Sequence, residues 1–353
     1  MTNIVKIGSI EIGAGRPIAI QSMTKTDTRD IAATINQIRE LKTIGCDIIR
    51  MAIVDMEAAA AVGEIRRAIG TETPLVADIH FDYRLALECI RQGIDKIRIN
   101  PGNIGDRDRV RQVAAAAKER GVPIRIGVNG GSLDKALLRK YGGAATAEAL
   151  VESAVEQADV LNMCGFYDIV VSLKSSDVFL TVEACRLFHK QNTGIPQHIG
   201  ITETGTIISG LVKSTIGLYE LLRDGIGDTL RISLTGDPVD EVIAAKTLMQ
   251  TLTGNGGIDL ISCPTCGRCK LNIADIINKL ERRLQGIRTD KHITVAVMGC
   301  AVNGPGEARR ADIGVAGGDG RAMLFKFGEP QYYISESTLA DTLINEIMTY
   351  VSS

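Results

Sequence analysis

Residues 48–80, IIRMAIVDMEAAAAVGEIRRAIGTETPLVADIH, show the unit from which most of this chain is built. A short apolar run comes first, followed by a longer run with apolar residues at helical spacing and a glycine near its end. A second short apolar run completes the unit, which predicts a strand, a helix and a parallel strand. The pattern continues on both sides, and we expect eight strands at residues 18–23, 48–53, 75–80, 96–100, 124–129, 168–174, 198–202 and 229–234.

Eight strand–helix units fit a (β/α)8 TIM barrel in size and number. A doubly wound sheet is the competing α/β architecture, but no GxGxxG motif follows the first of these strands. We expect a short pair of strands before the barrel, a last barrel helix at 237–252 and a flexible joint at 253–259, TGNGGID. The sequence then changes rhythm and predicts a small α+β domain. The 353 residues are thus divided into a barrel at 1–257 and a second domain at 258–353.

Composition excludes several classes of protein. The formal net charge of -2 gives no basic field for DNA or RNA, and aromatic residues make up only 4% with no Trp, so a base-stacking surface is not expected. No run of eighteen apolar residues and no signal-peptide pattern occurs, so neither nucleic acid nor a membrane is an expected partner. We expect a cytoplasmic protein, in which clustered cysteines are candidates for metal binding or redox chemistry.

Five of the eight predicted strands carry a cation where a barrel strand normally has Val, Ile or Leu. An unpaired buried cation is costly, so each of them needs a partner. Asp78 and Glu203 are the carboxylates at matching positions, and they are too few. The excess positive charge predicts an anionic ligand, and guanidinium groups suit phosphate or diphosphate oxygens. The five cations are Arg50, Arg98, Arg125, Lys174 and Arg231.

Further polar residues accompany these cations. Period-2 alternation places Asn100, Asn129 and Ser233 on the same strand faces as the preceding arginines, where they can form hydrogen bonds to a ligand. His80 and His198 stand at or beside strand ends and are candidate proton carriers, with a structural role as the alternative. Some of the arginines could instead point outward and pair with acids on helices.

The cysteines pose a separate question. Residues 262–269, SCPTCGRC, contain C-x2-C-x2-C, and residues 298–307, MGCAVNGPGE, add one thiol, Cys300, before a Gly-Pro-Gly turn. Structural zinc, a 4Fe-4S cluster and a redox dithiol are the three hypotheses. Zinc ribbons generally supply a second CxxC, and a dithiol leaves Cys300 unexplained. We therefore favour the cluster, because amides at the turn can approach its sulfides.

Together these motifs resemble the hydroxymethylbutenyl diphosphate synthase family, the iron–sulfur enzyme of the non-mevalonate isoprenoid pathway. The resemblance covers essentially the whole chain and is closest to the bacterial two-domain form. GCxVNGPGE in combination with CPxC is a highly specific pair of motifs. The segments that carry the resemblance are IQSMT (20–24), VADIHFDYRLAL (76–87), RINPGNIG (98–105), CPTCGR (263–268) and GCAVNGPGE (299–307).

The resemblance implies a ligand set for a 4Fe-4S cluster. Cys263, Cys266 and Cys300 would bind three irons, and Glu307 would bind the fourth. A carboxylate is a harder ligand than a thiolate and easier to displace, so one iron could exchange it for a substrate oxygen. Cys269 departs from the family motif. It is either a bystander or a competitor of Glu307 for the fourth iron, and we favour the bystander.

The resemblance also implies a reaction, in which the cyclic diphosphate of 2-C-methylerythritol is opened and loses water with uptake of two electrons and protons. Flavodoxin or ferredoxin would be the electron donor. Residues at positions that grip the diphosphate in the family are Arg50, Arg98, Arg125, Asn129, Lys174 and Ser233. Asp78, His80, Asn100 and Glu203 would surround the methylerythritol part, with Glu203 as proton donor. The strand pattern adds Arg231 and His198 to the predicted substrate-binding residues.

The family further implies a head-to-tail homodimer, in which the cluster domain of one subunit caps the barrel of the other. Two other hypotheses remain open at this point. The first is a barrel lyase or aldolase that uses Lys174 as a Schiff-base nucleophile and keeps a structural zinc in its second domain. The second is a metal-dependent sensor of a phosphate ligand without catalytic activity.

Overall fold

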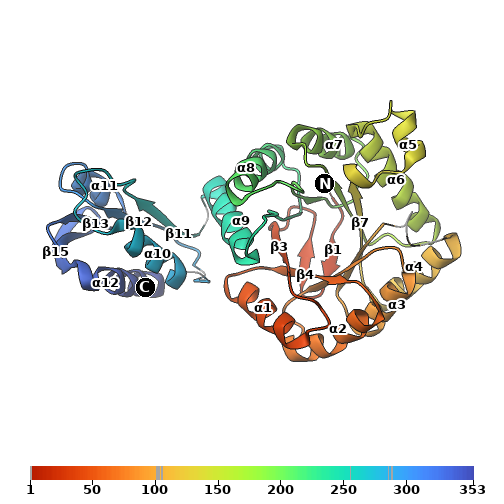
Figure 1. Ribbon diagram of the computed structural model, residues 1–353, viewed down its shortest axis with the longest axis horizontal. Helices are drawn as coiled ribbons and strands as arrows, with labels where there is room; N and C mark the ends of the chain where they lie inside the picture. The colour runs from red at the N-terminus through yellow and green to blue at the C-terminus, as the bar shows by residue number, and fades with distance from the viewer. Residues whose placement is uncertain (1, 101–103, 105, 255, 285, 288) are drawn as a thin grey trace. The chain divides into compact units, whose positions relative to one another are not determined.

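The computed structural model describes residues 2–100, 104, 106–254, 256–284, 286–287 and 289–353. Its contacts divide it into two compact units, one that ends at Leu248 and one at Met249–Ser353 (Figure 1). This division lies within a helix, so the domain boundary between residues 257 and 258 stays a prediction.

Eight parallel strands form the sheet of the first unit, and this confirms the predicted barrel fold. Each strand begins within one residue of its predicted start, because each is a short apolar run buried on both faces. The last two strands are shorter than predicted. The strands are β3 (Ala19–Met23), β4 (Ile48–Ile53), β5 (Leu75–Ile79), β6 (Lys96–Ile99), β7 (Ile124–Asn129), β8 (Ile169–Lys174), β9 (His198–Ile199) and β10 (Thr229–Leu230).

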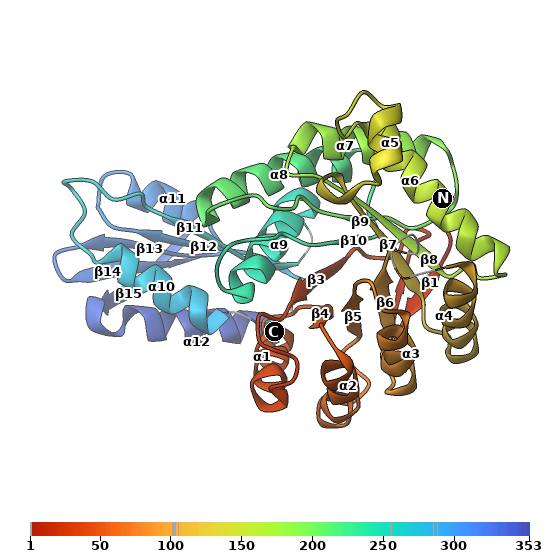
Figure 2. The same cartoon turned by 45° about the vertical axis from the view of Figure 1, so that its right-hand side comes forward.

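These strands follow the order β8, β7, β6, β5, β4, β3, β10, β9 around the barrel (Figure 2). A parallel bridge between Val171 and Gln197 closes the ring, and the Val171 N–H donates a hydrogen bond to the Pro196 carbonyl at 2.9 Å. Parallel strands direct all their C-terminal ends to one side of the sheet. Side chains that follow or end these strands therefore gather at one mouth of the barrel.

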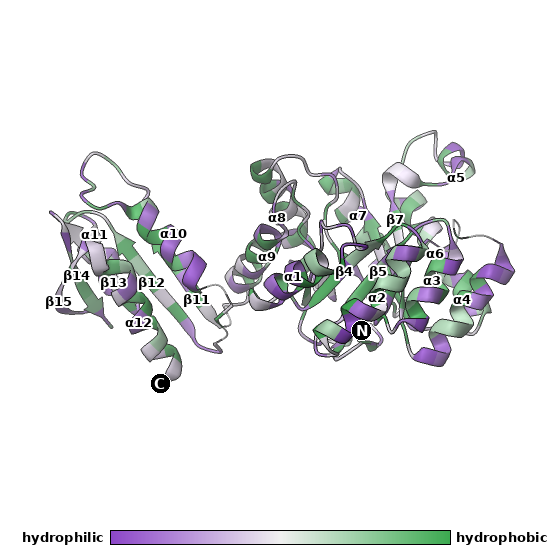
Figure 3. Cartoon of the chain, turned by 60° about the horizontal axis from the view of Figure 1, so that its bottom comes forward, coloured by the Kyte–Doolittle hydropathy of each residue, from purple (hydrophilic) through white to green (hydrophobic). Residues whose placement is uncertain are grey.

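Helices cover the outside of this barrel, and aspartates start many of them. Asp55, for example, accepts a hydrogen bond from the Ala58 N–H and caps a helix that Gly70 ends. Figure 3 shows green hydrophobic strands inside and purple residues on the helices. The helices are α1 (Ile31–Thr43), α2 (Met56–Ile69), α3 (Tyr83–Arg91), α4 (Arg107–Arg120), α5 (Lys135–Lys140), α6 (Ala147–Met163), α7 (Val178–Lys190), α8 (Ile207–Arg223) and α9 (Pro238–Thr253), with a 3-10 turn, η1 (Gly130–Ser132).

The expected N-terminal pair of strands is an antiparallel hairpin, β1 (Val5–Ile7) and β2 (Ile10–Ile12). Ile7 and Ile12 are fully buried, and they pack against apolar side chains that lie near the starts of the barrel strands. An apolar plug therefore fills the end of the barrel opposite the mouth. Its other members are Val5, Ala19, Ile48, Val76 and Val170.

The second unit is a five-stranded mixed sheet with helices, in agreement with the predicted α+β domain. The first three strands are parallel, and the fourth is antiparallel to both the third and the fifth. The first and last of its helices pack on the sheet in one apolar core. In sheet order the strands are β11 (Gly257–Ser262), β12 (His292–Met298), β13 (Ile313–Gly318), β14 (Arg321–Lys326) and β15 (Glu329–Ser335); the helices are α10 (Ile273–Leu284), α11 (Gly304–Arg310) and α12 (Leu339–Ser352), which a short 3-10 turn, η2 (Glu336–Thr338), precedes.

Two local predictions in this unit were wrong. Residues 257–262 form the edge strand β11, although the segment 253–259, of which 255 lies outside the described residues, was expected to be a flexible joint. The expected Gly-Pro-Gly turn opens helix α11, because proline fits the first turn of a helix and Gly304 packs closely against Met298 and Ala316. No helix in the described part of the chain is long and apolar enough to cross a membrane.

Candidate active site

The cationic strand residues face the barrel interior, and Asp78 lies among them. Its carboxylate is 3.7 Å from Arg50 Nη2 and 3.4 Å from Arg98 Nη1. Arg98 Nη1 also lies 3.0 Å from His80 Nε2, which is 3.6 Å from the Asp78 carboxylate. One acid from β5 thus orients a guanidinium from β4 and another from β6. Arg50 also donates to the sulfur of Met23 at 2.9 Å.

This arrangement shifts the pKa of both Asp78 and Arg50. Burial alone would raise the pKa of Asp78, but Arg50, the hydrogen bond from His80 and Arg98 together hold it well below its ordinary value. Burial lowers the pKa of Arg50 to about 10, against the effect of Asp78 and with help from Arg231 and Arg98. The carboxylate is therefore ionised at neutral pH, and the cations around it repel one another.

A glycine makes room for the Arg98 side chain. A Cβ atom on Gly127 would lie only 2.3 Å from Arg98 Nε and 2.6 Å from Nη2. Arg98 Nη2 donates a hydrogen bond to the Gly127 carbonyl at 3.2 Å in the space that this leaves. A glycine inside a strand often marks a close approach of another group, and at Gly127 that group is the Arg98 side chain.

Arg125 is the most buried arginine of the group, with 1% of its surface exposed. Its Nε and Nη1 atoms have no hydrogen-bond partner in the described part of the chain. Burial lowers its pKa well below the usual range, and the charges of Arg50 and Arg98 lower it further. A buried guanidinium without an acid partner is costly, so this position suits an anion that comes from outside the chain.

Lys174 ends β8 beside a buried histidine. Its Nζ is 3.3 Å from His198 Nε2, and His198 Nδ1 is 2.8 Å from Thr229 Oγ1. His198 and Thr229 have no exposed surface. Burial, and then the charges of Arg125 and Arg50, lower the pKa of Lys174. His198 thus lies behind Lys174 in the barrel wall.

Arg231 has an acid partner that the sequence analysis missed. Its Nε and Nη2 each donate to the Glu241 carboxylate at 3.0 Å. Glu241 is 1% exposed and also accepts from Ser22 Oγ at 2.8 Å and from the Leu234 N–H at 3.2 Å. The sequence offered one signal of this partner. Acidic residues occur in DPVDEV (237–242), at the start of the helix that follows the strand region of Arg231. The count of matching carboxylates was therefore incomplete, and Arg231 is neutralised within the chain.

The count of cations was incomplete as well. Lys96 on β6 is fully buried, and within the described part of the chain its Nζ donates only to Gln21 Oε1, at 3.5 Å. Burial, followed by Arg125 and Arg50, lowers its pKa well below the usual range. Glu203, in contrast, is exposed in the loop after β9, where its φ of 55° is unusual for a residue other than glycine. The interior is more cationic than the sequence indicated.

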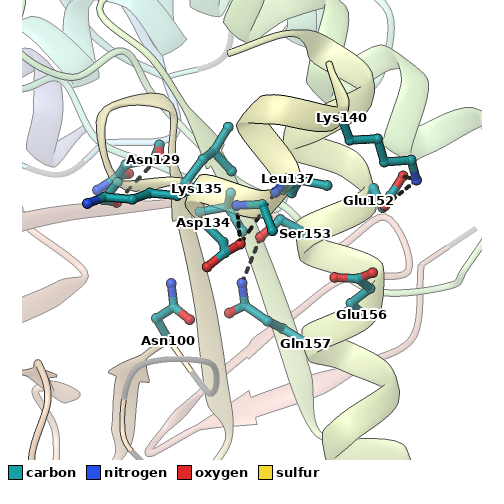
Figure 4. A pocket seen from close by; sticks show the side chains of 14 residues that line it. Asn100, Asn129, Asp134, Lys135, Leu137, Lys140, Glu152, Ser153, Glu156 and Gln157 are labelled. Carbon is teal, nitrogen blue, oxygen red and sulfur yellow. Dashed lines mark hydrogen bonds and ion pairs between the residues drawn. The ribbon is translucent and has the colours of Figure 1, made fainter. Parts of the chain in front are cut away.

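Two of the predicted polar residues, Asn100 and Asn129, line the same cavity of about 710 Å³. It opens between the ends of β6 and β7 and the helices α5 and α6 (Figure 4). Lys135 and Gln157 face it from these helices. Ser233 is half-buried after β10, and its carbonyl accepts a hydrogen bond from Thr204 Oγ1 at 2.7 Å.

In the second unit, the predicted metal ligands lie after neighbouring parallel strands. Cys263 follows β11 directly, Cys300 follows β12, and Ser262 pairs with Val297 in the ladder between them. Backbone amides at Val302 and Asn303 lower the pKa of the Cys300 thiol. A thiol with a lowered pKa is more often a thiolate, which is the form that binds iron.

The two cysteine segments also touch. The Lys270 N–H donates to the Gly299 carbonyl at 2.9 Å, and the Cys269 sulfur occupies the space where a side chain on residue 299 would lie. The Cys269 thiol donates to the Leu271 carbonyl at 3.2 Å. Glu307 is exposed in the first turn of α11, 3.7 Å from Arg310.

Among the described residues, no three His, Cys, Asp or Glu side chains are grouped closely enough to hold a metal ion. The donor set nevertheless has the right chemistry for an iron–sulfur cluster. Three cysteines and one carboxylate follow two adjacent parallel strands, and one thiol is activated by backbone amides. These residues fit such a cluster by composition and by their position at one end of the sheet.

Comparison with known proteins gives the family. Residues 2–246 match the GcpE TIM-barrel domain, and residues 259–349 match the GcpE protein C-terminal domain. The chain is 52% identical over 347 residues to the 4-hydroxy-3-methylbut-2-en-1-yl diphosphate synthase (flavodoxin) of Ruminiclostridium cellulolyticum, covering 98% of this chain and 97% of the relative. It is 54% identical over 347 residues to the protein of the same name from Geobacter sulfurreducens, with the same coverage.

Among solved structures, dihydropteroate synthase from Thermus thermophilus is similar over 71% of this chain and 98% of its own, with a TM-score of 0.51 and 15% identity. A Coxiella burnetii dihydropteroate synthase matches 72% of this chain and all of its own, with a TM-score of 0.51 and 12% identity. At this identity the likeness shows only the barrel fold. The full-length relatives give no support to the Schiff-base lyase hypothesis. Across both of its units, the chain belongs to the GcpE family.

Proposed function

We propose that this chain is a 4-hydroxy-3-methylbut-2-enyl diphosphate synthase, which opens 2-C-methyl-D-erythritol 2,4-cyclodiphosphate reductively and removes one hydroxyl as water. The observation that carries the proposal is the buried positive charge in the barrel, above all the Arg125 guanidinium, which has no acid partner among the described residues. A diphosphate supplies the missing anion. The names of the relatives support the same substrate and product.

In this proposal the barrel, residues 1–257, binds the substrate. Arg125 and Lys174 have no acid partner among the described residues and contact the diphosphate most strongly. Arg50 and Arg98 are held by Asp78 and direct their remaining N–H groups to it. Asn100, Asn129 and Ser233 add neutral hydrogen bonds. Arg231 contributes less charge than predicted, because Glu241 neutralises it.

Residues 258–353 would hold a 4Fe-4S cluster through Cys263, Cys266, Cys300 and Glu307. Such a cluster supplies electrons one at a time, which no ordinary side chain can do. The amides at Val302 and Asn303 favour the thiolate of Cys300 as a ligand. Among the described residues, the exposed Glu307 forms one long ion pair, to Arg310, which it would give up to bind iron.

The loss of water needs a proton, and two side chains are suited to give it. Glu203 is exposed at the mouth side of β9 and is our proposed donor. His80 is half-exposed beside Asp78 and Arg98 and can hold or pass a proton near the methylerythritol part. Both follow barrel strands, where residues that act on a substrate are expected.

Flavodoxin is the proposed electron donor, because the relatives carry it in their names; ferredoxin is the second possibility. We further propose a cytoplasmic homodimer, in which the cluster domain of one copy closes the barrel of the other. Such an assembly would bring electrons to a substrate that the barrel alone holds.

Anaerobic purification and reconstitution of the full chain test this function. We expect about four irons and four sulfides per chain, and turnover of the cyclic diphosphate with reduced flavodoxin. Arg125→Gln should lose substrate binding in calorimetry while it keeps the iron spectrum. Arg111→Gln, at an exposed site on α4, is the matched control. A wild-type protein that binds iron but not the cyclic diphosphate would refute the proposed substrate.

A further inference from the structure

Lys174 differs from Arg50, Arg98 and Arg231 because no carboxylate among the described residues pairs with it. Arg50 and Arg98 share the Asp78 carboxylate, and Arg231 is paired with Glu241. Lys174 Nζ instead lies 3.3 Å from a histidine nitrogen, that of His198. Because Gly200 has no side chain, it leaves the space beside this ammonium open; a Cβ there would lie 3.0 Å from Nζ.

Both ring nitrogens of His198 have a polar neighbour. With Lys174 as an ammonium, which has only donors, His198 Nε2 accepts from it and Nδ1 carries the proton. Nδ1 then donates to Thr229 Oγ1 at 2.8 Å. Burial, and after it the charges of Arg125, Lys174 and Lys96, lower the pKa of His198 well below its usual range, so the ring stays neutral.

This neutrality matters for a ligand that carries several negative charges. A carboxylate in place of His198 would hold the ammonium equally well but would cancel its charge towards the ligand. A neutral acceptor holds the ammonium and leaves its charge intact. His198 itself has no exposed surface, so it cannot touch a ligand in the mouth.

We propose that His198, held by Thr229, is a positioning residue for Lys174, a neutral acceptor that fixes the ammonium group without neutralising it for the diphosphate. The proposal rests on the proposed function. It replaces the expected direct contact between His198 and substrate with an indirect role. It also explains why a histidine is buried in a barrel wall among cations.

The test compares variants of the full-length, reconstituted chain by calorimetric titration with the cyclic diphosphate and by steady-state kinetics. His198→Gln and His198→Glu are matched in size and both offer an acceptor, but only the second adds a negative charge. We expect His198→Gln to bind within about threefold of wild type, and His198→Glu and His198→Leu to bind at least about tenfold more weakly. The loss should appear in KM, with kcat changed less.

A double-mutant cycle separates this role from a general effect on folding. If His198 acts through Lys174, His198→Leu should have little further effect on binding in a Lys174→Met background. Equal affinity of the Gln and Glu variants, or an undiminished effect of His198→Leu without the lysine, would overturn the proposal.

Thr229→Val gives a second test should His198→Leu not fold, because it removes only the acceptor for Nδ1. We expect it to weaken binding by a few fold, and wild-type affinity in this variant would count against the role of Thr229. If the wild-type chain itself does not bind the cyclic diphosphate, the proposed function fails. If wild type binds and the His198 variants bind equally well, only the positioning role fails.

Discussion

Replacement of Glu241 by Gln should strongly destabilise the barrel. The Glu241 side chain is 1% exposed, and that of Arg231 is 12% exposed. The two form two hydrogen bonds at 3.0 Å, and Glu241 accepts two more, from Ser22 and from the Leu234 N–H. Glutamine keeps the shape but has one acceptor oxygen, and its amide N–H groups would face donors.

The size of the effect follows from this geometry. Removal of one partner from a buried ion pair costs about 3–5 kcal/mol, because the other charge remains buried and uncompensated. Glutamine keeps part of the hydrogen bonding, so we expect the lower end, about 3 kcal/mol in the free energy of unfolding. For a unit of this size, that corresponds to a fall in Tm of roughly 6–12 °C.

Differential scanning calorimetry on the full chain can measure this shift in the transition of the barrel. Asp240→Asn is the matched control, since Asp240 is exposed in the same first turn of α9 and also loses one negative charge. It should change Tm by no more than about 1–2 °C. A Glu241→Gln protein as stable as this control would refute the view that Arg231 depends on Glu241.

Three other predictions concern the cysteines, Gly127 and Asp78. Cys300→Ala should abolish the iron–sulfur absorbance and paramagnetic signal, whereas Cys269→Ser should keep them, because its thiol donates to a backbone carbonyl. Gly127→Ala should displace the Arg98 guanidinium and weaken binding of the cyclic diphosphate by about tenfold or more in calorimetry. Because the pKa of Asp78 is lowered in the folded chain, its contribution to stability should be complete above its ordinary value of 3.8 and lost as the pH falls below it.

Each of these has an outcome that contradicts it. Loss of the signal in Cys269→Ser would make Cys269 a ligand. Gly131→Ala is the control for Gly127→Ala because nothing lies within 4 Å of its added Cβ, and equal effects of the two would exclude a displaced arginine. For Asp78, the slope of unfolding free energy against pH between about 4 and 2 should be shallower in Asp78→Asn than in wild type. Equal slopes would mean that other groups set the acid limb.

The barrel strands could be predicted because each is a short apolar run, and burial on both faces leaves little choice of residue. The cations could be predicted as inward-facing for the same reason, since Arg98 and Arg125 break such runs. Their partners could not. Glu241 lies ten residues after Arg231 on a different element, and only the packing of α9 brings the two together.

Other features depend on contacts that no local pattern records. Gly127 has a role only because Arg98, on the neighbouring strand, needs its space. Helix α11 contains two glycines and a proline, which are poor helix formers, and tertiary packing around Gly304 outweighs this propensity. The edge strand β11 has no fully buried residue, and only Ile258 and Leu260 of its side chains pack against the core, so its apolar pattern is short and weak.

The hairpin β1–β2 has a consequence for the order of events in a catalytic cycle. Since Ile7 and Ile12 close the far end of the barrel, substrate enters and product leaves through the same opening. Product must therefore dissociate before the next substrate molecule can bind. We expect product to be a competitive inhibitor with respect to substrate. The rate of product release would then set an upper limit on kcat.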